Sequence, residues 1–202
     1  MAANFRSLTF TPRVLDAQQH YFGRVQSQLP APSEDILTPE ETSFIEARDH
    51  FYLSSVSETG WPYVQHRGGT TGFLKIIGPN QLAFADYQGN RQLLTTGNLA
   101  ADNRVCLFLM DYVHRDRLKI LGHAEVLDAR ANPELVAQLT DPELAPTVER
   151  IIQIRVVAFD WNCSKYITPR YTAAEMKEAI APLRRRIAEL EAQLQKTAPS
   201  SE

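Results

Sequence analysis

Hydrophobic and polar residues alternate through most of the middle of the chain. Because successive side chains of a strand point to opposite faces of its sheet, this alternation predicts half-buried β-strands. Short turn sequences, such as Glu-Thr-Gly at 58–60 and Pro-Asn at 79–80, separate adjacent runs and predict hairpins. The predicted strands are 51–57, 61–68, 73–78, 81–86, 104–112, 117–128 and 150–161.

Helical segments interrupt this pattern at a few places. The best-defined helix follows Thr38, which can cap it, with Pro39 at the first position and Glu41 completing a capping box. Two shorter helices are expected within 90–102 and 132–139. Strands joined mostly by short turns, with helices as insertions, favour a mainly β fold with helices (α+β), an antiparallel barrel rather than a parallel α/β sheet.

The two ends of the chain differ from this middle part. Residues 1–35 show no clear period and are expected to be irregular, with a loop at 28–35. Near the C-terminus a helix is predicted, because Thr172 and Glu175 stand in capping-box positions. The chain is therefore divided into an N-terminal extension (1–37), a barrel domain (38–170) and a helical tail (171–202).

The tail carries apolar residues at alternating spacings of four and three, the pattern of a coiled-coil seam. These residues are Met176, Ile180, Leu183, Ile187, Leu190 and Leu194. Pro182 interrupts the seam and removes a backbone hydrogen bond, so we expect a kink there or a helix that restarts. Two arrangements remain open: the helix packs on its own barrel, or it contacts another subunit.

Charge and composition narrow the classes of partner. The 202 residues carry a formal net charge of −3, which argues against a surface that coats nucleic acid. No segment resembles a signal peptide or a membrane span, so we expect a cytoplasmic protein with neither nucleic acid nor membrane as partner. The five histidines are scattered, and Cys106 and Cys163 form no zinc-binding pattern, so no metal is expected and Cys163 is interpreted as inert.

Candidate chemistry begins in the stretch Tyr-Val-Gln-His-Arg-Gly-Gly-Thr-Thr-Gly-Phe-Leu-Lys-Ile at 63–76. Glycine inside a strand usually marks a bulge, a bend or a close approach by a ligand or another backbone. Two basic side chains, His66 and Arg67, stand beside these glycines. The stretch therefore indicates an anion held near the main chain.

A second candidate is Tyr-Gln-Gly-Asn-Arg-Gln at 87–92, which follows one predicted strand and opens a predicted helix. Backbone amides at a helix start and an arginine can hold a phosphate together, which makes Asn90, Arg91 and Gln92 candidate ligands. An arginine after a Gly-Asn turn is also often simply exposed, and this alternative stays open. The chain has neither a P-loop nor a GxGxxG dinucleotide fingerprint.

Several motifs occur in the order typical of one family. They are Gly-Trp-Pro-Tyr-Val at 60–64, Phe-x-x-x-x-Gly-x-Arg at 84–91, Asn-Arg-Val-Cys-Leu-Phe at 103–108 and Arg-Leu-x-Ile-x-Gly-x-Ala at 117–124. In this order the chain resembles the pyridoxamine 5'-phosphate oxidase-like family of FMN-binding split β-barrels over roughly residues 38 to 162. The runs at 65–69 and 160–163 also resemble a bacterial subgroup assigned to FMN-dependent enzymes.

The resemblance implies FMN as cofactor and assigns roles to particular positions. It implies that Arg91 and Gln92, with Lys75, hold the phosphate, that 70–75 runs beside the cofactor, and that Arg117 reaches the flavin ring. The glycines would then let the strand backbone approach FMN. The full set of implied cofactor-binding residues is His66, Arg67, Gly68, Thr70, Thr71, Gly72, Lys75, Ala85, Asp86, Asn90, Arg91, Gln92, Arg117, Trp161 and Arg170.

The chain also departs from the family pattern. Gln92 stands where a second basic residue is usual, and Thr70 stands where an arginine is usual, with Arg67 three residues earlier as a substitute. The Arg-x-His-Asp-Arg substrate motif is absent, and 160–171 loosely resembles it only through Trp161 and Arg170. FMN therefore remains the expected cofactor, whereas pyridoxamine phosphate is not the expected substrate.

Three functions follow from the resemblance. The favoured one is an FMN-dependent oxidoreductase acting on an unidentified small molecule, with NAD(P)H as a candidate electron donor and no assigned catalytic acid or base. The others are a non-catalytic flavin carrier or sensor and a barrel that binds haem or a deazaflavin. A homodimer with two shared FMN sites is expected, because the apolar strand 105–110 indicates burial on both faces and the family arrangement places Trp161 and Arg170 at the partner's site.

Overall fold

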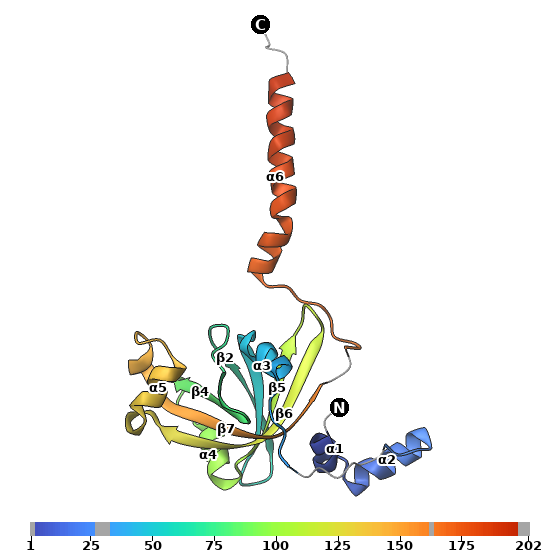
Figure 1. Ribbon diagram of the computed structural model, residues 1–202, viewed down its shortest axis with the longest axis vertical. Helices are drawn as coiled ribbons and strands as arrows, with labels where there is room; N and C mark the ends of the chain where they lie inside the picture. The colour runs from blue at the N-terminus through green and yellow to red at the C-terminus, as the bar shows by residue number, and fades with distance from the viewer. Residues whose placement is uncertain (1–2, 27–32, 162–163, 198–202) are drawn as a thin grey trace.

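The structure, a computed structural model, describes residues 3–26, 33–161 and 164–197 and is built around one seven-stranded sheet (Figure 1). The strands are β1 (His50–Val56), β2 (Pro62–Gly68), β3 (Lys75–Gly78), β4 (Gln81–Tyr87), β5 (Arg104–Asp111), β6 (Asp116–Asp128) and β7 (Val148–Trp161). The helices are α1 (Ala3–Thr9), α2 (Pro12–Phe22), α3 (Pro39–Glu46), α4 (Leu94–Ala101), α5 (Pro133–Leu139) and α6 (Ala173–Thr197), with 3-10 turns η1 (Ala129–Ala131) and η2 (Ala145–Thr147). All seven predicted strands are present within two residues of their expected bounds.

The sheet is antiparallel throughout and has the strand order β2-β1-β5-β6-β7-β4-β3. Its two longest strands, β6 and β7, pair in the middle. The sheet curls so far that Arg67 on the edge strand β2 forms an ion pair of 2.6 Å with Asp86 on β4, which is not its neighbour in the sheet. The predicted antiparallel barrel with inserted helices is therefore confirmed, and it is an open barrel whose far strands meet through side chains.

The main core fills the inside of this barrel. Its largest fully buried side chains include Phe51, Leu53, Phe84, Leu107, Leu118, Ile120, Ile152 and Ile154. A second, smaller core lies between α5 and the other face of β4 and β7, and Ala83, Ala85, Val136, Leu139 and Ile151 belong to it. The opposite orientation of neighbouring strand residues explains why one sheet supports two cores.

Strand β5 is less buried than its nearly continuous apolar sequence predicts. Val105, Leu107 and Leu109 are buried in the barrel, but Cys106 and Phe108 on the opposite face are only partly buried. Met110, on the same face near the end of the strand, is buried. The outer face is therefore only partly buried in the single chain, and its expected burial by a second copy stays a prediction.

Helix α3 is fixed by a capping box, as its sequence predicts. The Thr38 side chain accepts from the Glu40 amide at 3.3 Å, and the Glu41 carboxylate accepts from the Thr38 amide at 3.0 Å. Glu41 also accepts a hydrogen bond of 2.6 Å from the Trp161 indole of β7. Burial raises the pKa of Glu41, but the hydrogen bonds from Thr38 and Trp161 outweigh it and leave that pKa below its usual value.

The N-terminal region contains two helices, so the expectation of an irregular segment over 1–35 is wrong. Pro12 occupies the first turn of α2, and Gly23 ends this helix in the left-handed conformation with φ 65°. Both are ordinary helix-boundary signals, which the sequence already contained. Most of the loop predicted at 28–35, and Cys163 with its predicted inertness, lie outside the described residues.

The glycines after β2 are explained by contacts within the chain. A side chain at Gly69 would meet the Phe73 ring at 2.7 Å, and Gly72 has φ 77° and lies against the Glu46 carbonyl. Residues 69–74 form a turn between β2 and β3, so the part of the predicted strand before Lys75 is absent. These glycines therefore serve a tight turn of the chain.

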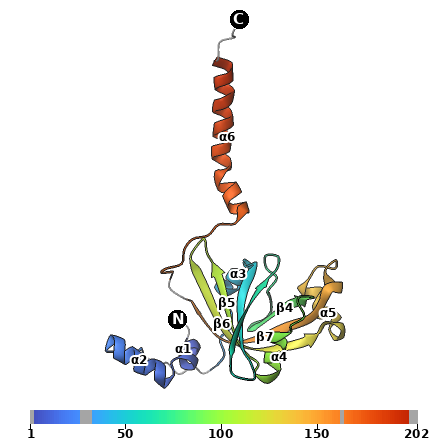
Figure 2. The ribbon, with the colours of Figure 1, turned by 180° about the vertical axis from the view of Figure 1, so that it is seen from behind.

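Helix α6 extends away from the barrel in both views (Figures 1 and 2). Its predicted capping box is confirmed, since the Glu175 amide donates to Thr172 at 3.2 Å and the Thr172 amide donates to Glu175 at 2.7 Å. The helix continues through Pro182, so it does not restart there, and it does not pack on its own barrel. No helix in the described ranges, α6 included, is long and apolar enough to cross a membrane.

We expect Glu41→Gln to lower the free energy of unfolding by about 1–3 kcal/mol at pH 7, because the charged acceptor of Thr38 and Trp161 is lost. A carboxylate with a lowered pKa stabilises the fold above its unfolded pKa and stops doing so as the pH falls through its folded value. The difference from the unsubstituted chain should therefore shrink well below pH 4.5, the usual pKa. Urea unfolding at pH 7 and pH 3.5 measures this, with exposed Glu40→Gln as the control. An equal loss at both pH values would contradict it.

Candidate functional site

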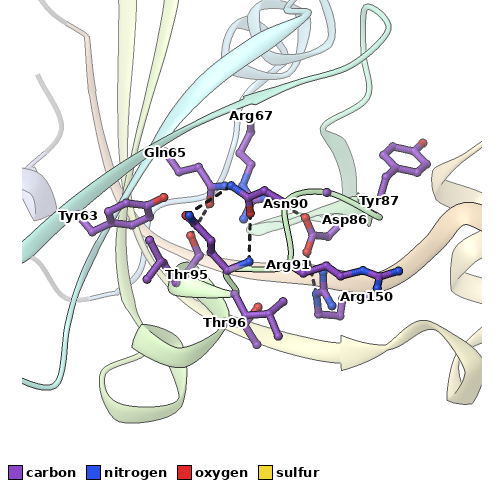
Figure 3. A pocket seen from close by; sticks show the side chains of 14 residues that line it. Tyr63, Gln65, Arg67, Asp86, Tyr87, Asn90, Arg91, Thr95, Thr96 and Arg150 are labelled. Carbon is purple, nitrogen blue, oxygen red and sulfur yellow. Dashed lines mark hydrogen bonds and ion pairs between the residues drawn. The ribbon is translucent and has the colours of Figure 1, made fainter.

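A cavity of about 210 Å³ lies between β2, β4, the loop 89–93 and the start of α4 (Figure 3), and is called the β2–α4 cavity below. One wall comes from every second residue of β2, because side chains at this spacing share a face: Tyr63, Gln65 and Arg67. The other lining residues are Asp86, Tyr87, Gly89, Asn90, Arg91, Gln92, Leu93, Leu94, Thr95, Thr96 and Arg150.

The charged centre of the cavity is one carboxylate between two guanidinium groups. Asp86 accepts from Arg67 at 2.6 Å and from Arg150 at 2.8 Å, and the three side chains are only 10–19% exposed. Arg150 also forms an ion pair of 3.0 Å with Glu149. Burial lowers the pKa of Arg150, but its bonds to Asp86 and Glu149 raise that pKa by a larger amount, so the net shift is upward. The Arg150 guanidinium therefore remains charged.

The loop from β4 to α4 has an unusual backbone. Arg91 and Leu93 both adopt the left-handed conformation, with φ 60° and φ 55°, and the Asn90 side chain accepts from the Gln92 amide at 3.1 Å. Non-glycine residues in this conformation are uncommon and concentrate at ligand sites. The two left-handed residues fold the loop back on itself, so that both line the cavity.

The N-terminus of α4 opens toward the same cavity. Leu93 occupies the cap position and makes no side-chain capping bond, although Leu94, Thr95 and Thr96 of the first turn line the cavity. The amides of a first helical turn have no partners within the helix. Thr95 donates to Gln65 at 2.7 Å, and Asn98 donates to Ser55 at 2.9 Å, so α4 is fixed to the wall of the barrel. The arrangement offers fixed donors to an anion.

Five of the residues predicted from the sequence meet in the β2–α4 cavity: Arg67, Asp86, Asn90, Arg91 and Gln92. Two others do not reach it. Thr70 and Lys75 line a separate cavity of about 270 Å³, between the 69–75 segment and α5, which we call the α5 cavity. The predicted grouping of Lys75 with Arg91 is therefore not present in the chain, because β3 begins only after the turn at 69–74 and directs Lys75 toward α5.

The remaining predicted residues line neither cavity. They are His66, Gly68, Thr71, Gly72, Ala85, Arg117, Trp161 and Arg170. His66 stacks on His50 at 5.6 Å between ring centroids, on the outer face of the barrel. Arg170 lies 4.9 Å from the Tyr112 ring, and Arg117 lies 6.0 Å from the Phe108 ring. Trp161 is held by Glu41 of its own chain, as described above.

Sequence reasoning missed several residues of the cavity. Tyr63 and Gln65 follow from Arg67 by the two-residue period of the strand, so this signal was present in the sequence. Arg150 had no such signal, because it reaches the cavity only through the pairing of β7 with β4, in which it stands opposite Asp86. Among the residues that the structure describes, no group of three histidine, cysteine or acidic side chains could hold a metal ion.

Solved structures of similar fold were found for this chain, all at low identity. A putative pyridoxamine 5'-phosphate oxidase from Lactobacillus delbrueckii is 18% identical, covering 62% of this chain and 93% of its own, with a TM-score of 0.49. HupZ from Group A Streptococcus is 11% identical, covering 67% and 100%, with a TM-score of 0.49. An FMN-binding protein from Syntrophomonas wolfei is 12% identical, covering 60% and 83%, with a TM-score of 0.46.

No curated protein matches the sequence. The family model described as pyridoxamine 5'-phosphate oxidase matches residues 37–160, which is more than half of the chain and runs from the cap of α3 almost to the end of β7. This segment contains the whole sheet except the last residue of β7, as well as all the residues that line the β2–α4 cavity. The chain therefore belongs to the pyridoxamine 5'-phosphate oxidase family.

Proposed function

We propose that this chain is a flavoprotein that holds FMN by its phosphate in the β2–α4 cavity and acts as an FMN-dependent oxidoreductase on a small molecule. The observation that carries the proposal is the convergence of three arginines and an uncapped helix start on one cavity. Membership of the pyridoxamine 5'-phosphate oxidase family supports the choice of FMN over other anions.

The charges of the cavity fit a phosphate. Arg67 and Arg150 are balanced by the carboxylates of Asp86 and Glu149, and Arg91 forms no ion pair with another described residue, so the charge of Arg91 is in excess. The Nε atom of Arg67 is buried without a hydrogen-bond partner among the described residues. Arginine suits phosphate because its planar guanidinium can donate to two oxygens at once.

Local geometry gives the other donors. The Thr96 side chain and the free amides at the start of α4 line the cavity beside Arg91. A helix N-terminus favours an anion through both its amides and its dipole. Gln92, which stands where family members usually carry a second basic residue, adds a neutral amide. In this proposal the missing charge is supplied by Arg150 from β7.

The volume of the cavity indicates which part of the cofactor it takes. Pockets that enclose whole drug-sized ligands have about 300–1,000 Å³. The β2–α4 cavity has about 210 Å³, which suits the phosphate and the adjoining chain of FMN but not the flavin ring as well. The ring would then lie at the mouth of the cavity, near Tyr63 and Tyr87.

Bound FMN would supply hydride and electron transfer, and the chain's own residues would bind and orient it. The lining has one carboxylate, Asp86, and its two oxygens are occupied by hydrogen bonds from Arg67 and Arg150. No histidine lines the cavity among the described residues. The proposed role of the protein is to hold the cofactor and leave its ring accessible.

A homodimer with two shared sites is part of the proposal. A flavin ring at the mouth of the cavity needs a second surface to exclude water from its open face. The outer face of the barrel offers one, since Tyr52, Cys106, Phe108 and Leu121 lie there only partly buried. A second copy placed on this face by a twofold axis would produce two equal sites.

The first expected outcome concerns the cofactor. The purified protein should be yellow, and the flavin released on denaturation should have the mass of FMN and not of FAD. Addition of NADH or NADPH should bleach the bound flavin, and air should restore its colour. A protein that stays colourless after incubation with FMN would contradict the proposed binding. A bound flavin that neither NADH nor NADPH reduces would support a non-catalytic flavin carrier and contradict the proposed oxidoreductase activity.

The second outcome locates the phosphate. We expect Arg91→Ala to weaken FMN binding by about 2–4 kcal/mol, or about 30- to 1,000-fold, because a charge-assisted contact is lost. Lys75→Ala is the matched control, since it removes the same charge from the α5 cavity and should change the affinity less than about threefold. Fluorescence titration of both variants measures this. A larger loss of FMN affinity in Lys75→Ala than in Arg91→Ala would indicate that the phosphate binds in the α5 cavity.

The third outcome concerns assembly. Sedimentation of the FMN-loaded protein at micromolar concentration should give a dimer. Phe108→Glu should shift it toward the monomer and lower FMN affinity, because it places a charge on the outer face of β5. Val14→Glu on exposed α2 is the control and should leave the dimer unchanged. A stable monomer that retains FMN would contradict the shared site.

A further inference from the structure

Helix α6 has an apolar seam that is largely exposed in the described chain. Its members Met176, Leu183, Ile187, Leu190 and Leu194 are 42–69% exposed. The helix has 25 residues and is therefore about 37 Å long at 1.5 Å per residue. Such a helix in water normally owes its stability to packing of its apolar face. The projection of α6 away from the barrel leaves this face available (Figure 2).

We propose that α6 pairs with α6 of a second copy of this chain in a parallel, in-register, two-stranded coiled coil. The spacing of the seam assigns Ile180, Ile187 and Leu194 to heptad position a, and Met176, Leu183 and Leu190 to position d. Isoleucine at a with leucine at d favours two parallel strands over trimers or tetramers. The seam therefore fits a copy of itself.

The charges beside the seam select the parallel orientation. In a parallel pair, position g of one helix faces position e of the next heptad on the other helix. Arg186 at g then faces Glu191 of the partner subunit, and twofold symmetry repeats this pair. Arg184 at e faces a neutral position, Ala179 of the partner subunit. No like charges meet along the described seam.

The antiparallel alternative brings like charges together. With the same overlap of the seam, an antiparallel pair is centred between Leu183 and Ile187. Arg184 at e and Arg186 at g of the two helices would then lie against each other. Like charges at such positions are a recognised means of excluding a wrong pairing. The sequence thus disfavours the antiparallel arrangement by repulsion.

Two further features are compatible with the pair. Pro182 occupies position c, which faces away from a partner, so the proline ring stays outside the interface. Arg186 now bonds Glu189 of its own helix at 3.0 Å, but both side chains are 61% exposed, and such exposed pairs contribute little. Arg186 can therefore exchange this partner for Glu191 of the partner subunit.

Disulfide trapping in the full-length chain tests the pair. In a background with Cys106→Ser and Cys163→Ser, Leu190→Cys places a thiol at position d, where two parallel helices bring the same residue together. Ala192→Cys at position f, on the outer side, is the matched control for proximity caused only by dimerisation of the barrels. We expect Leu190→Cys to form the linked dimer at least about tenfold faster than Ala192→Cys in glutathione buffer.

Equal rates of linkage for the two variants would overturn the proposal. Absence of a linked dimer from Leu190→Cys would also overturn it, and is the result expected if α6 binds a helix of another protein or pairs antiparallel. A charge exchange tests the orientation separately. Arg186→Glu and Glu191→Arg should each slow the linkage, and the double exchange should restore it. Additive losses in the double variant would overturn the parallel register.

Discussion

The two guanidinium groups that share the Asp86 carboxylate join parts of the barrel that the backbone ladder leaves apart. Strand β2 is one edge of the sheet, and β4 lies next to the other edge. Arg67 spans this gap to Asp86, and Arg150 reaches the same carboxylate from β7. Because all three groups are largely buried, loss of one partner leaves an uncompensated charge, which typically costs about 3–5 kcal/mol.

The same junction determines what the β2–α4 cavity can bind. The Asp86 carboxylate positions both guanidiniums, and Glu149 pairs with Arg150 as well, so the junction directs two arginine side chains to the floor of the cavity. The strained loop then adds Arg91, and the fixed helix α4 adds its free amides. Barrel closure and the proposed anion binding therefore depend on the same charged group, which links the stability of the fold to the proposed site.

Local sequence patterns were sufficient to predict most of the fold. The two-residue alternation located every strand, and the capping boxes at Thr38 and Thr172 located the starts of α3 and α6, because these signals depend only on near neighbours. The phosphate-loop pattern likewise identified Asn90 and Arg91, which line the β2–α4 cavity in the structure. Helix α2 was missed although Pro12 and Gly23 at its ends carry ordinary boundary signals, and none of its residues is buried in the core.

The parts that could not be predicted depend on contacts between distant segments. Arg150 meets Asp86 across 64 positions, and Trp161 meets Glu41 across 120, so neither partner is visible in the local sequence. Lys75 lies in the α5 cavity and not beside Arg91, because a turn replaces the first part of its predicted strand. The glycines beside Arg67 indicated a ligand, but the Phe73 ring and the Glu46 carbonyl are the groups that require them.

The most direct test of the central claim is the ratio of the dissociation constants of riboflavin and FMN, which differ only by the phosphate. Two charge-assisted hydrogen bonds to the phosphate, each contributing about 1.5–3 kcal/mol, predict that FMN binds more than about 100-fold more tightly. Titration of the apoprotein with both flavins measures the ratio. Equal affinities would show that the β2–α4 cavity does not hold the phosphate and would contradict the account.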